Sequence, residues 1–171
     1  MSGERVKIGI EGLDQMMGGG LIPGNICAII GTYGTGKTTF ALEFVWEGLK
    51  KGENVIYISL EEREDRIFRY MDEKGWDTTP YRGRALSVLK LDPSDFNLAI
   101  NSIKNELPAL VSQLGAQRVV IDPVSLFEDL FDRDSDRRRE MFRFVDTLRD
   151  QHCTIVLTSE TDKDNPFASR H

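Results

Sequence analysis

The feature that most restricts how this chain can fold is a glycine-rich loop between an apolar run and an amphipathic segment. The apolar run covers Asn25–Ile30, and the amphipathic segment covers Thr38–Lys51, with Gly52 after it as a stop signal. The loop follows the pattern GxxxxGK[ST] with one further threonine, and consists of Gly31, Thr32, Tyr33, Gly34, Thr35, Gly36, Lys37, Thr38 and Thr39. A strand, a tight loop and a helix in this order direct backbone N–H groups and the positive end of a helix at one point. The sequence therefore predicts a binding site for phosphate groups.

The residue types of this loop suit a nucleoside triphosphate with Mg²⁺. Its glycines permit backbone conformations in which successive amides point inward. Lys37 supplies an ammonium group for the β- and γ-phosphates, Thr38 offers a hydroxyl to Mg²⁺, and Thr39 can donate to the α-phosphate. The alternative is a glycine turn followed by a threonine N-cap, with Lys37 merely exposed. The strand before the loop and the helix after it favour the phosphate site, although the loop itself does not distinguish ATP from GTP.

The rest of the chain alternates in the same way. Four more short apolar runs, typical of strands covered on both faces, lie at Asn54–Ser59, Leu86–Leu91, Arg118–Ile121 and Thr154–Thr158. Helical patterns lie at Arg63–Lys74, Ser94–Leu107, where Pro108 then breaks or restarts the turn, and Asp136–Asp150. This alternation predicts an α/β fold, a doubly wound and mainly parallel sheet flanked by helices. With no repeat and no linker, we expect a single domain over residues 1–171.

A carboxylate follows the run Arg118–Ile121 directly. Asp122 stands at the end of a predicted buried strand, before Pro123. A phosphate-binding loop needs such an acid to hold Mg²⁺, usually at the end of another buried strand. Asp before Pro is also a common way to begin a turn. The loop upstream favours the metal role, so Thr38 and Asp122 are the predicted metal ligands.

Two adjacent carboxylates, Glu61 and Glu62, close the run before them, and two interpretations of this pair stay open. One is a capping box, in which Glu62 reaches back to the amide of Ser59. The other is catalytic, with one carboxylate orienting and deprotonating the water that attacks the γ-phosphate. Because like charges repel, one of the two pKa values is expected to be raised.

Polar residues also follow the last apolar run, at Thr158-Ser159-Glu160. They can sense the γ-phosphate through hydrogen bonds, or they can simply begin a polar loop. The residues alone slightly favour the loop.

Composition narrows the class of protein. The chain has 28 acidic and 22 basic residues, a net charge of −6, and nucleic-acid binders are usually basic. No apolar run approaches the about 20 residues of a membrane helix, and the first residues lack the apolar core of a signal peptide. Cys27 and Cys153 lie within apolar runs without metal-ligand spacing, which indicates buried thiols in a reducing compartment. We therefore expect a cytoplasmic protein that does not bind membranes.

Together these motifs resemble the KaiC-like ATPases of the RecA superfamily, over essentially the whole chain. The similar features, in order, are the lead-in Gly9–Gly24 with its three consecutive glycines, the phosphate-binding loop, the Glu61-Glu62 pair, Asp122, and Thr158-Ser159-Glu160. The resemblance implies a parallel sheet of strand order 3-2-4-5-1. It also implies later strands beside the first, so we expect that C-terminal strands are missing from this chain.

The resemblance implies Mg²⁺-dependent ATP hydrolysis, with Glu61, Glu62 and Lys37 as catalytic residues. It also implies a homo-oligomeric ring, often a hexamer, with ATP bound between subunits and an Arg or Lys supplied by the neighbour. Arg137-Arg138-Arg139 can face such a neighbour, but the acids around them favour a solvated helix start. Autophosphorylation, known in the clock members, needs acceptor residues in a later segment that this sequence does not show.

Two other functional classes stay open beside an ATPase that couples turnover to conformational change. A DNA recombination or repair ATPase needs basic DNA-binding loops, whereas the stretch Pro123–Asp132 is acidic and apolar and would repel phosphate. A nucleotide-binding interaction module with little turnover is the other class. Its contact surface would be Phe127, Leu130 and Phe131, although burial in the domain core is the simpler explanation for these residues.

Overall fold

A computed structural model gives the fold of the chain. It describes residues 3–32, 34, 36–92, 94–95, 101–128, 139, 143, 146, 149 and 152–161, with the backbone alone described at 103, 127 and 128. No helix among these residues combines the length and the apolar character needed to cross a membrane.

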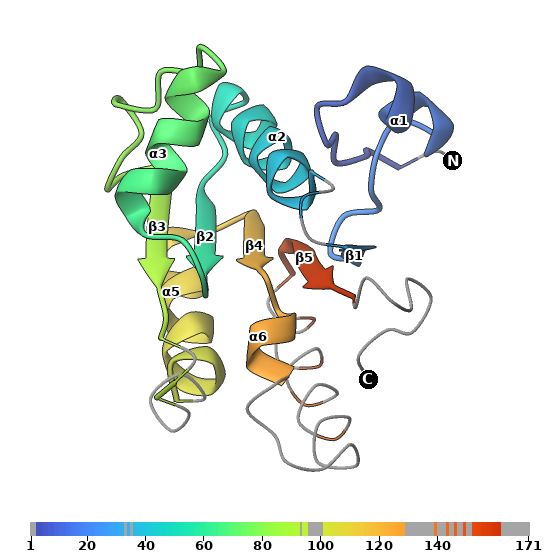
Figure 1. Cartoon of the computed structure of the whole chain (residues 1–171). Helices are drawn as coiled ribbons and strands as arrows, with labels where there is room; N and C mark the ends of the chain where they lie inside the picture. The colour runs from blue at the N-terminus through green and yellow to red at the C-terminus, as the bar shows by residue number, and fades with distance from the viewer. Residues whose placement is uncertain are drawn as a thin grey trace.

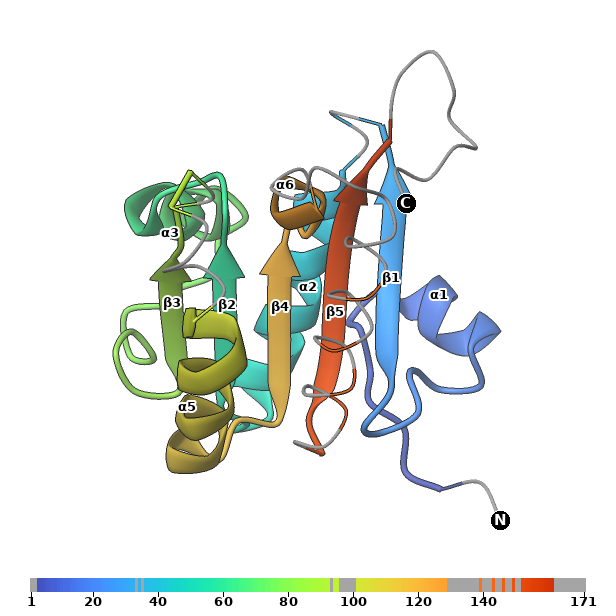
Figure 2. The ribbon, with the colours of Figure 1, turned by 90° about the horizontal axis from the view of Figure 1, so that it is seen from below.

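Five parallel strands form the centre of the molecule (Figure 2). They are β1 (Ile26–Gly31), β2 (Val55–Ser59), β3 (Leu86–Lys90), β4 (Arg118–Asp122) and β5 (Thr154–Glu160), in the spatial order β1-β5-β4-β2-β3. All four pairings are parallel. The α/β prediction and the strand order implied by the resemblance are therefore confirmed, because β1-β5-β4-β2-β3 is 3-2-4-5-1 seen from the other edge.

Helices cover both faces of the sheet (Figure 1). The described elements are α1 (Glu11–Met16), α2 (Lys37–Lys50), α3 (Glu64–Glu73), the π-helical turn η1 (Ser102–Glu106), α5 (Leu107–Leu114) and α6 (Ser125–Glu128). Residues of α2 and α3 pack on one face in a core that includes Phe44, Tyr57 and Val120. Residues of α5 pack on the other face with Ile121 and Ile155. Every residue of β2 and β4 is buried, as the continuous apolar runs predicted, whereas β1, at the edge of the five-stranded sheet, is only partly covered and leaves Ile30 exposed.

The helix predicted over Ser94–Leu107 differs from the observed one. Among the described residues the helix runs from 101 through η1 and α5 to Leu114. Pro108 does not end the helix: it follows the π-helical turn η1 directly and lies in the first turn of α5. Of the helix predicted at Asp136–Asp150, only residues 139, 143, 146 and 149 are described, and all four are helical.

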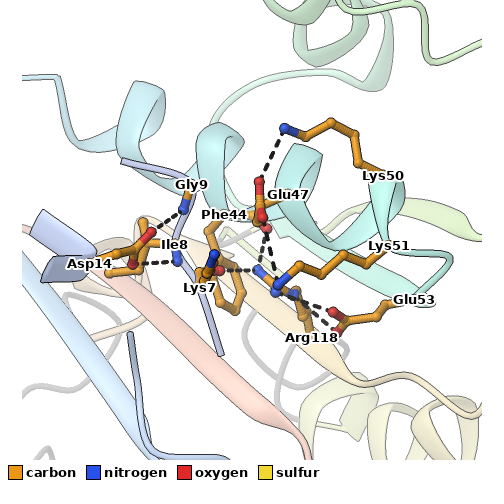
Figure 3. Close-up of polar contacts among 10 residues, drawn as sticks. All are labelled: Lys7, Ile8, Gly9, Asp14, Phe44, Glu47, Lys50, Lys51, Glu53 and Arg118. Atoms are coloured by element: carbon orange, nitrogen blue, oxygen red, sulfur yellow. Dashed lines mark hydrogen bonds and ion pairs between the residues drawn. The ribbon is translucent and has the colours of Figure 1, made fainter. Parts of the chain in front are cut away.

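Residues 6–25, which include the lead-in Gly9–Gly24, lie beside α2, and hydrogen bonds from backbone amides to one side chain hold this segment in its own fold (Figure 3). The Asp14 carboxylate accepts hydrogen bonds from the amides of Ile8 (2.8 Å) and Gly9 (3.0 Å). Val6 and Leu21 form an antiparallel bridge that brings the two ends of the segment together. The segment is therefore folded by its own contacts and is not a linker.

A fully buried arginine, Arg118, is the first residue of β4 and joins this N-terminal segment to α2 (Figure 3). Arg118 forms a two-point contact with the Glu53 carboxylate, at 3.1 and 3.2 Å. It also donates to the carbonyl oxygens of Lys7 (2.7 Å) and Phe44 (2.8 Å). β4 therefore begins at an ion pair between a buried arginine and a partly exposed glutamate, and it ends at Asp122.

Candidate nucleotide-binding and hydrolysis site

The predicted site residues meet at the carboxyl ends of the strands, where α/β sheets usually bind ligands. One cavity of about 550 Å³ is lined by the loop after β1, by the residues that follow β2, and by the last residues of β4 and β5. The predicted residues on its wall are Gly34, Gly36, Lys37, Thr38, Thr39, Glu61, Glu62 and Asp122. Segments as far apart in sequence as those that hold Gly34 and Glu160 therefore contribute to a single concave site.

The loop has the backbone geometry that its glycines predicted at two positions. Gly34 and Gly36 have φ of 78° and 85°, in the left-handed region that favours glycine. Gly36 is also the N-cap of α2, and no side chain of the described residues caps this helix, so the positive end of α2 is left open at the cavity. Gly31 differs from the expectation, because it ends β1 in the strand ladder opposite Glu160. Tyr33 and Thr35 lie outside the described residues.

Lys37 begins α2 and lies across the loop. Its side chain is only 7% exposed, and its Nζ donates to the carbonyl oxygen of Thr32 at 2.6 Å. An ammonium group fixed at the mouth of an anion-binding loop adds positive charge where phosphates would sit. The alternative of a merely exposed lysine is wrong for this geometry.

Asp122 is held by three hydroxyl groups. Its Oδ2 accepts a hydrogen bond from the Thr38 hydroxyl at 3.1 Å and another from the Tyr57 hydroxyl, while its Oδ1 accepts from the Thr158 hydroxyl. Burial, followed by the charge of Asp122, raises the pKa of Tyr57 well above its usual value, so the phenol keeps its proton and donates. The carboxylate is 5% exposed and faces the first turn of α2.

The residues present fit a Mg²⁺ ion bound together with phosphates. Thr38 and Asp122 supply hard oxygen donors that already lie within hydrogen-bond distance of each other. Across the described part of the chain, no cluster of three or more His, Cys, Asp or Glu residues is arranged to hold a metal alone. Mg²⁺ typically takes one or two protein ligands and completes its shell with substrate phosphates and waters.

The capping box expected as one interpretation of Glu61 and Glu62 does not form. Leu60, Glu61 and Glu62 form a bend, Arg63 has an extended backbone, and α3 begins only at Glu64, too far along for Ser59 to cap it. The Ser59 hydroxyl instead donates to the backbone carbonyl of Glu62 at 2.5 Å. Both glutamates line the cavity.

The two glutamates have different surroundings. The carboxylate of Glu62 accepts a hydrogen bond from the Tyr70 hydroxyl (3.3 Å) and pairs with Arg66 (3.4 Å), both on α3. Partial burial, and then the charges of Glu160, Glu62 and Asp122, raise the pKa of Glu61, and Lys90 opposes this rise. Glu62 is therefore attached to α3, whereas the proton affinity of Glu61 is increased.

The end of β5 belongs to the site, contrary to the interpretation as a simple loop start. Thr158 bonds Asp122, and Glu160 lines the cavity with its amide held by the Ser125 hydroxyl at 3.1 Å. Sequence reasoning missed Tyr57 because an aromatic residue within an apolar strand indicates core packing. The available signal was that Tyr57 lies two residues before Ser59, on the same face of the strand, and Ser59 lies opposite Asp122 in the sheet.

Some predicted features fall where the structure gives no placement. Arg137 and Arg138, and the side chains of Phe127, Leu130 and Phe131, lie outside the described residues. Both cysteines are free thiols; Cys153 is buried, as the sequence indicated, whereas Cys27 is only half-buried.

Comparison with known proteins gives one consistent family. Residues 6–171 match the family model described as "ATPase: KaiC". The UPF0273 protein MK0039 of Methanopyrus kandleri is 32% identical over 178 residues, which cover 94% of this chain and 68% of that protein. The circadian clock oscillator protein KaiC of Parathermosynechococcus lividus is 33% identical over 95% of this chain, which spans only 32% of the clock protein.

A solved structure agrees with these sequence matches. The crystal structure of the KaiC-like protein PH0186 from Pyrococcus horikoshii OT3 superimposes with a TM-score of 0.81 at 29% identity, covering 92% of this chain and 72% of that one. The matched region includes every residue placed on the cavity wall.

Proposed function

The chain belongs to the KaiC family of ATPases, and from this premise we propose that it binds ATP with Mg²⁺ in the cavity and hydrolyses it. Family membership supports nucleotide binding and an ATPase-type function. The observation that supports the proposal is that one cavity is lined by a lysine, a threonine and two acids from separate segments, namely Lys37, Thr38, Asp122 and Glu61.

Binding of the triphosphate is assigned to the loop and the start of α2. The N–H groups of the loop and the first turn of α2 donate hydrogen bonds to the phosphate oxygens, and Lys37 adds a positive charge beside them. Thr38 and Asp122 would hold Mg²⁺, which supplies charge neutralisation at the β- and γ-phosphates. Thr39, on the same wall, can donate to the α-phosphate.

Hydrolysis is assigned to Glu61 as the base. A water attacks the γ-phosphorus, the bond to the β-phosphate oxygen breaks, and the water's proton passes to the Glu61 carboxylate. A raised pKa suits this role, since a carboxylate with increased proton affinity accepts a proton more readily. Glu62, held by Tyr70 and Arg66, links the same loop to α3.

Through this link the proposed turnover can change the position of α3. A change at the γ-phosphate alters the loop that carries Glu61 and Glu62, and the Glu62 contacts transmit that change to α3. We further propose that the protein acts as a homo-oligomeric ring in which a neighbour completes the site. The family resemblance motivates this step.

Phosphate release, measured alongside binding of an ATP analogue, tests the function. We expect Lys37→Ala to abolish binding, Glu61→Gln to bind without turnover, and Lys50→Ala, an exposed lysine on the same helix, to behave like the unaltered protein. Light scattering with and without ATP and Mg²⁺ tests the ring. If ATP binds but Glu61→Gln leaves a slow phosphate release unchanged, the protein is a nucleotide-binding interaction module instead.

A further inference from the structure

The carboxylate of Asp122 is fixed from three directions by side chains of three elements. Thr38 approaches from α2, while Tyr57 and Thr158 approach from β2 and β5, the strands on either side of β4. Tyr57 and Thr158 are completely buried, so neither meets the nucleotide directly. Their hydroxyl groups donate to Asp122 from the buried interior of the sheet.

The register of the sheet explains why both reach the same carboxylate. Ser59 of β2 lies opposite Asp122, so Tyr57, two residues earlier on the same face, extends its longer side chain up to it. Ile121 lies opposite Leu157 of β5, which places Thr158 beside Asp122. The two donors therefore occupy both flanks of the carboxylate and bond different oxygens.

Hydroxyl groups hold a carboxylate without cancelling its charge. The terminal torsion of an Asp side chain is broad, so an unsupported carboxylate rotates over a wide range. Donors on both oxygens fix its plane, and an ammonium or guanidinium partner would additionally neutralise it. Here the charge remains available to a cation, in a buried place where electrostatic attraction is stronger than in water.

We propose that Tyr57 and Thr158 are positioning residues that orient the Asp122 carboxylate for Mg²⁺, an inference that rests on the proposed function. Groups that orient a metal ligand in this way typically change metal affinity by about 10–100-fold when removed. Tyr57→Phe removes one oxygen and keeps the ring that fills the core. Thr158→Val removes the other hydroxyl at nearly constant volume.

The test separates metal affinity from nucleotide affinity. Calorimetry measures binding of a non-hydrolysable ATP analogue in EDTA, and then the Mg²⁺ concentration that produces half of the additional binding. We expect Tyr57→Phe to raise that concentration about 10-fold and to leave the affinity in EDTA unchanged. Tyr81→Phe, which alters a tyrosine packed on Trp46 away from the cavity, should leave both values unchanged.

Each contrary result has a distinct meaning. An unaltered Mg²⁺ requirement in Tyr57→Phe, or an equal loss of binding with and without Mg²⁺, overturns the positioning role. If Tyr57→Phe does not fold, Thr158→Val decides by the same two measurements. If the unaltered protein binds the analogue without any effect of Mg²⁺, the metal role of Asp122 in the proposed function fails, and the inference fails with it.

Discussion

Gly48 is a helix position where a single added methyl group should strongly destabilise the fold. It lies in the buried face of α2, against the Arg118 side chain. A Cβ at this position would lie 2.6 Å from Cδ and 2.7 Å from Nε of Arg118, and 3.3 Å from Cγ2 of Val55. Carbon atoms in contact prefer a separation of about 3.5–4.0 Å, so the arginine must move by about 1 Å.

Arg118 has no easy way to make this movement. Its guanidinium group is fixed by Glu53 and by the carbonyl oxygens of Lys7 and Phe44, at distances of 2.7–3.2 Å. A shift of about 1 Å takes such bonds beyond hydrogen-bond range. The added methyl group therefore costs both packing and part of a buried ion pair.

The expected loss follows from opposing effects. Overpacking costs about 1–3 kcal/mol, and breaking a buried ion pair costs about 3–5 kcal/mol. Alanine gains about 1 kcal/mol over glycine within a helix. With the ion pair only partly lost, we expect Gly48→Ala to lower the free energy of unfolding by about 3 kcal/mol, a fall in Tm of about 6–12 °C for a domain of this size.

Thermal and urea unfolding, followed by circular dichroism and tryptophan fluorescence, measure this loss. The fluorescence reports on α2 because Trp46 stacks on Trp76 with ring centroids 5.6 Å apart. Gly12→Ala is the matched control, since Gly12 lies in α1 with no atom within 4 Å of the added carbon, and it should be neutral or slightly stabilising. In an Arg118→Val background, Gly48→Ala should no longer destabilise. A neutral or stabilising Gly48→Ala in the otherwise unaltered protein refutes the reasoning.

Three further predictions concern ionisation and accessibility. Phosphate release should decline as the pH falls through the raised pKa of Glu61, and Glu160→Gln, by removing a nearby negative charge, should move that decline to lower pH. Because the folded state raises this pKa, ionisation of Glu61 costs stability as the pH rises, so Glu61→Gln should be more stable than the unaltered protein at about pH 8 in urea unfolding. Well below about pH 4.3, where a free glutamate is protonated, the two proteins should be equally stable. Burial raises the pKa of both Cys27 and Cys153, so a thiol reagent should label them slowly in the folded protein and rapidly in urea, and equal rates would contradict their burial.

Local sequence signals were sufficient for most of the site. The phosphate loop, Asp122 and the Glu61-Glu62 pair each end an apolar run, and the carboxyl ends of parallel strands share one edge of a sheet. Their meeting could therefore be predicted before any coordinates. The strand order came from the family resemblance, since the runs themselves do not specify which strands are neighbours.

The capping box shows where local signals fail. Ser59 and Glu62 have the spacing of a helix start, and the same residues also suit a non-helical loop that carries two carboxylates. The choice depends on where the backbone turns helical, and tertiary contacts make that choice. Tyr70 and Arg66 of α3 hold the Glu62 side chain, and the helix begins only at Glu64.

The sequence by itself determined the order of elements, the phosphate-binding loop and which acids stand at strand ends. Only the tertiary structure decided that Tyr57 and Thr158 hold Asp122, and that Arg118 is buried against Glu53, 65 residues away. Backbone propensity and apolar periodicity act over a few residues and can be seen in the chain. Contacts across strands depend on register and on the reach of each side chain, and these are fixed only when the sheet is assembled.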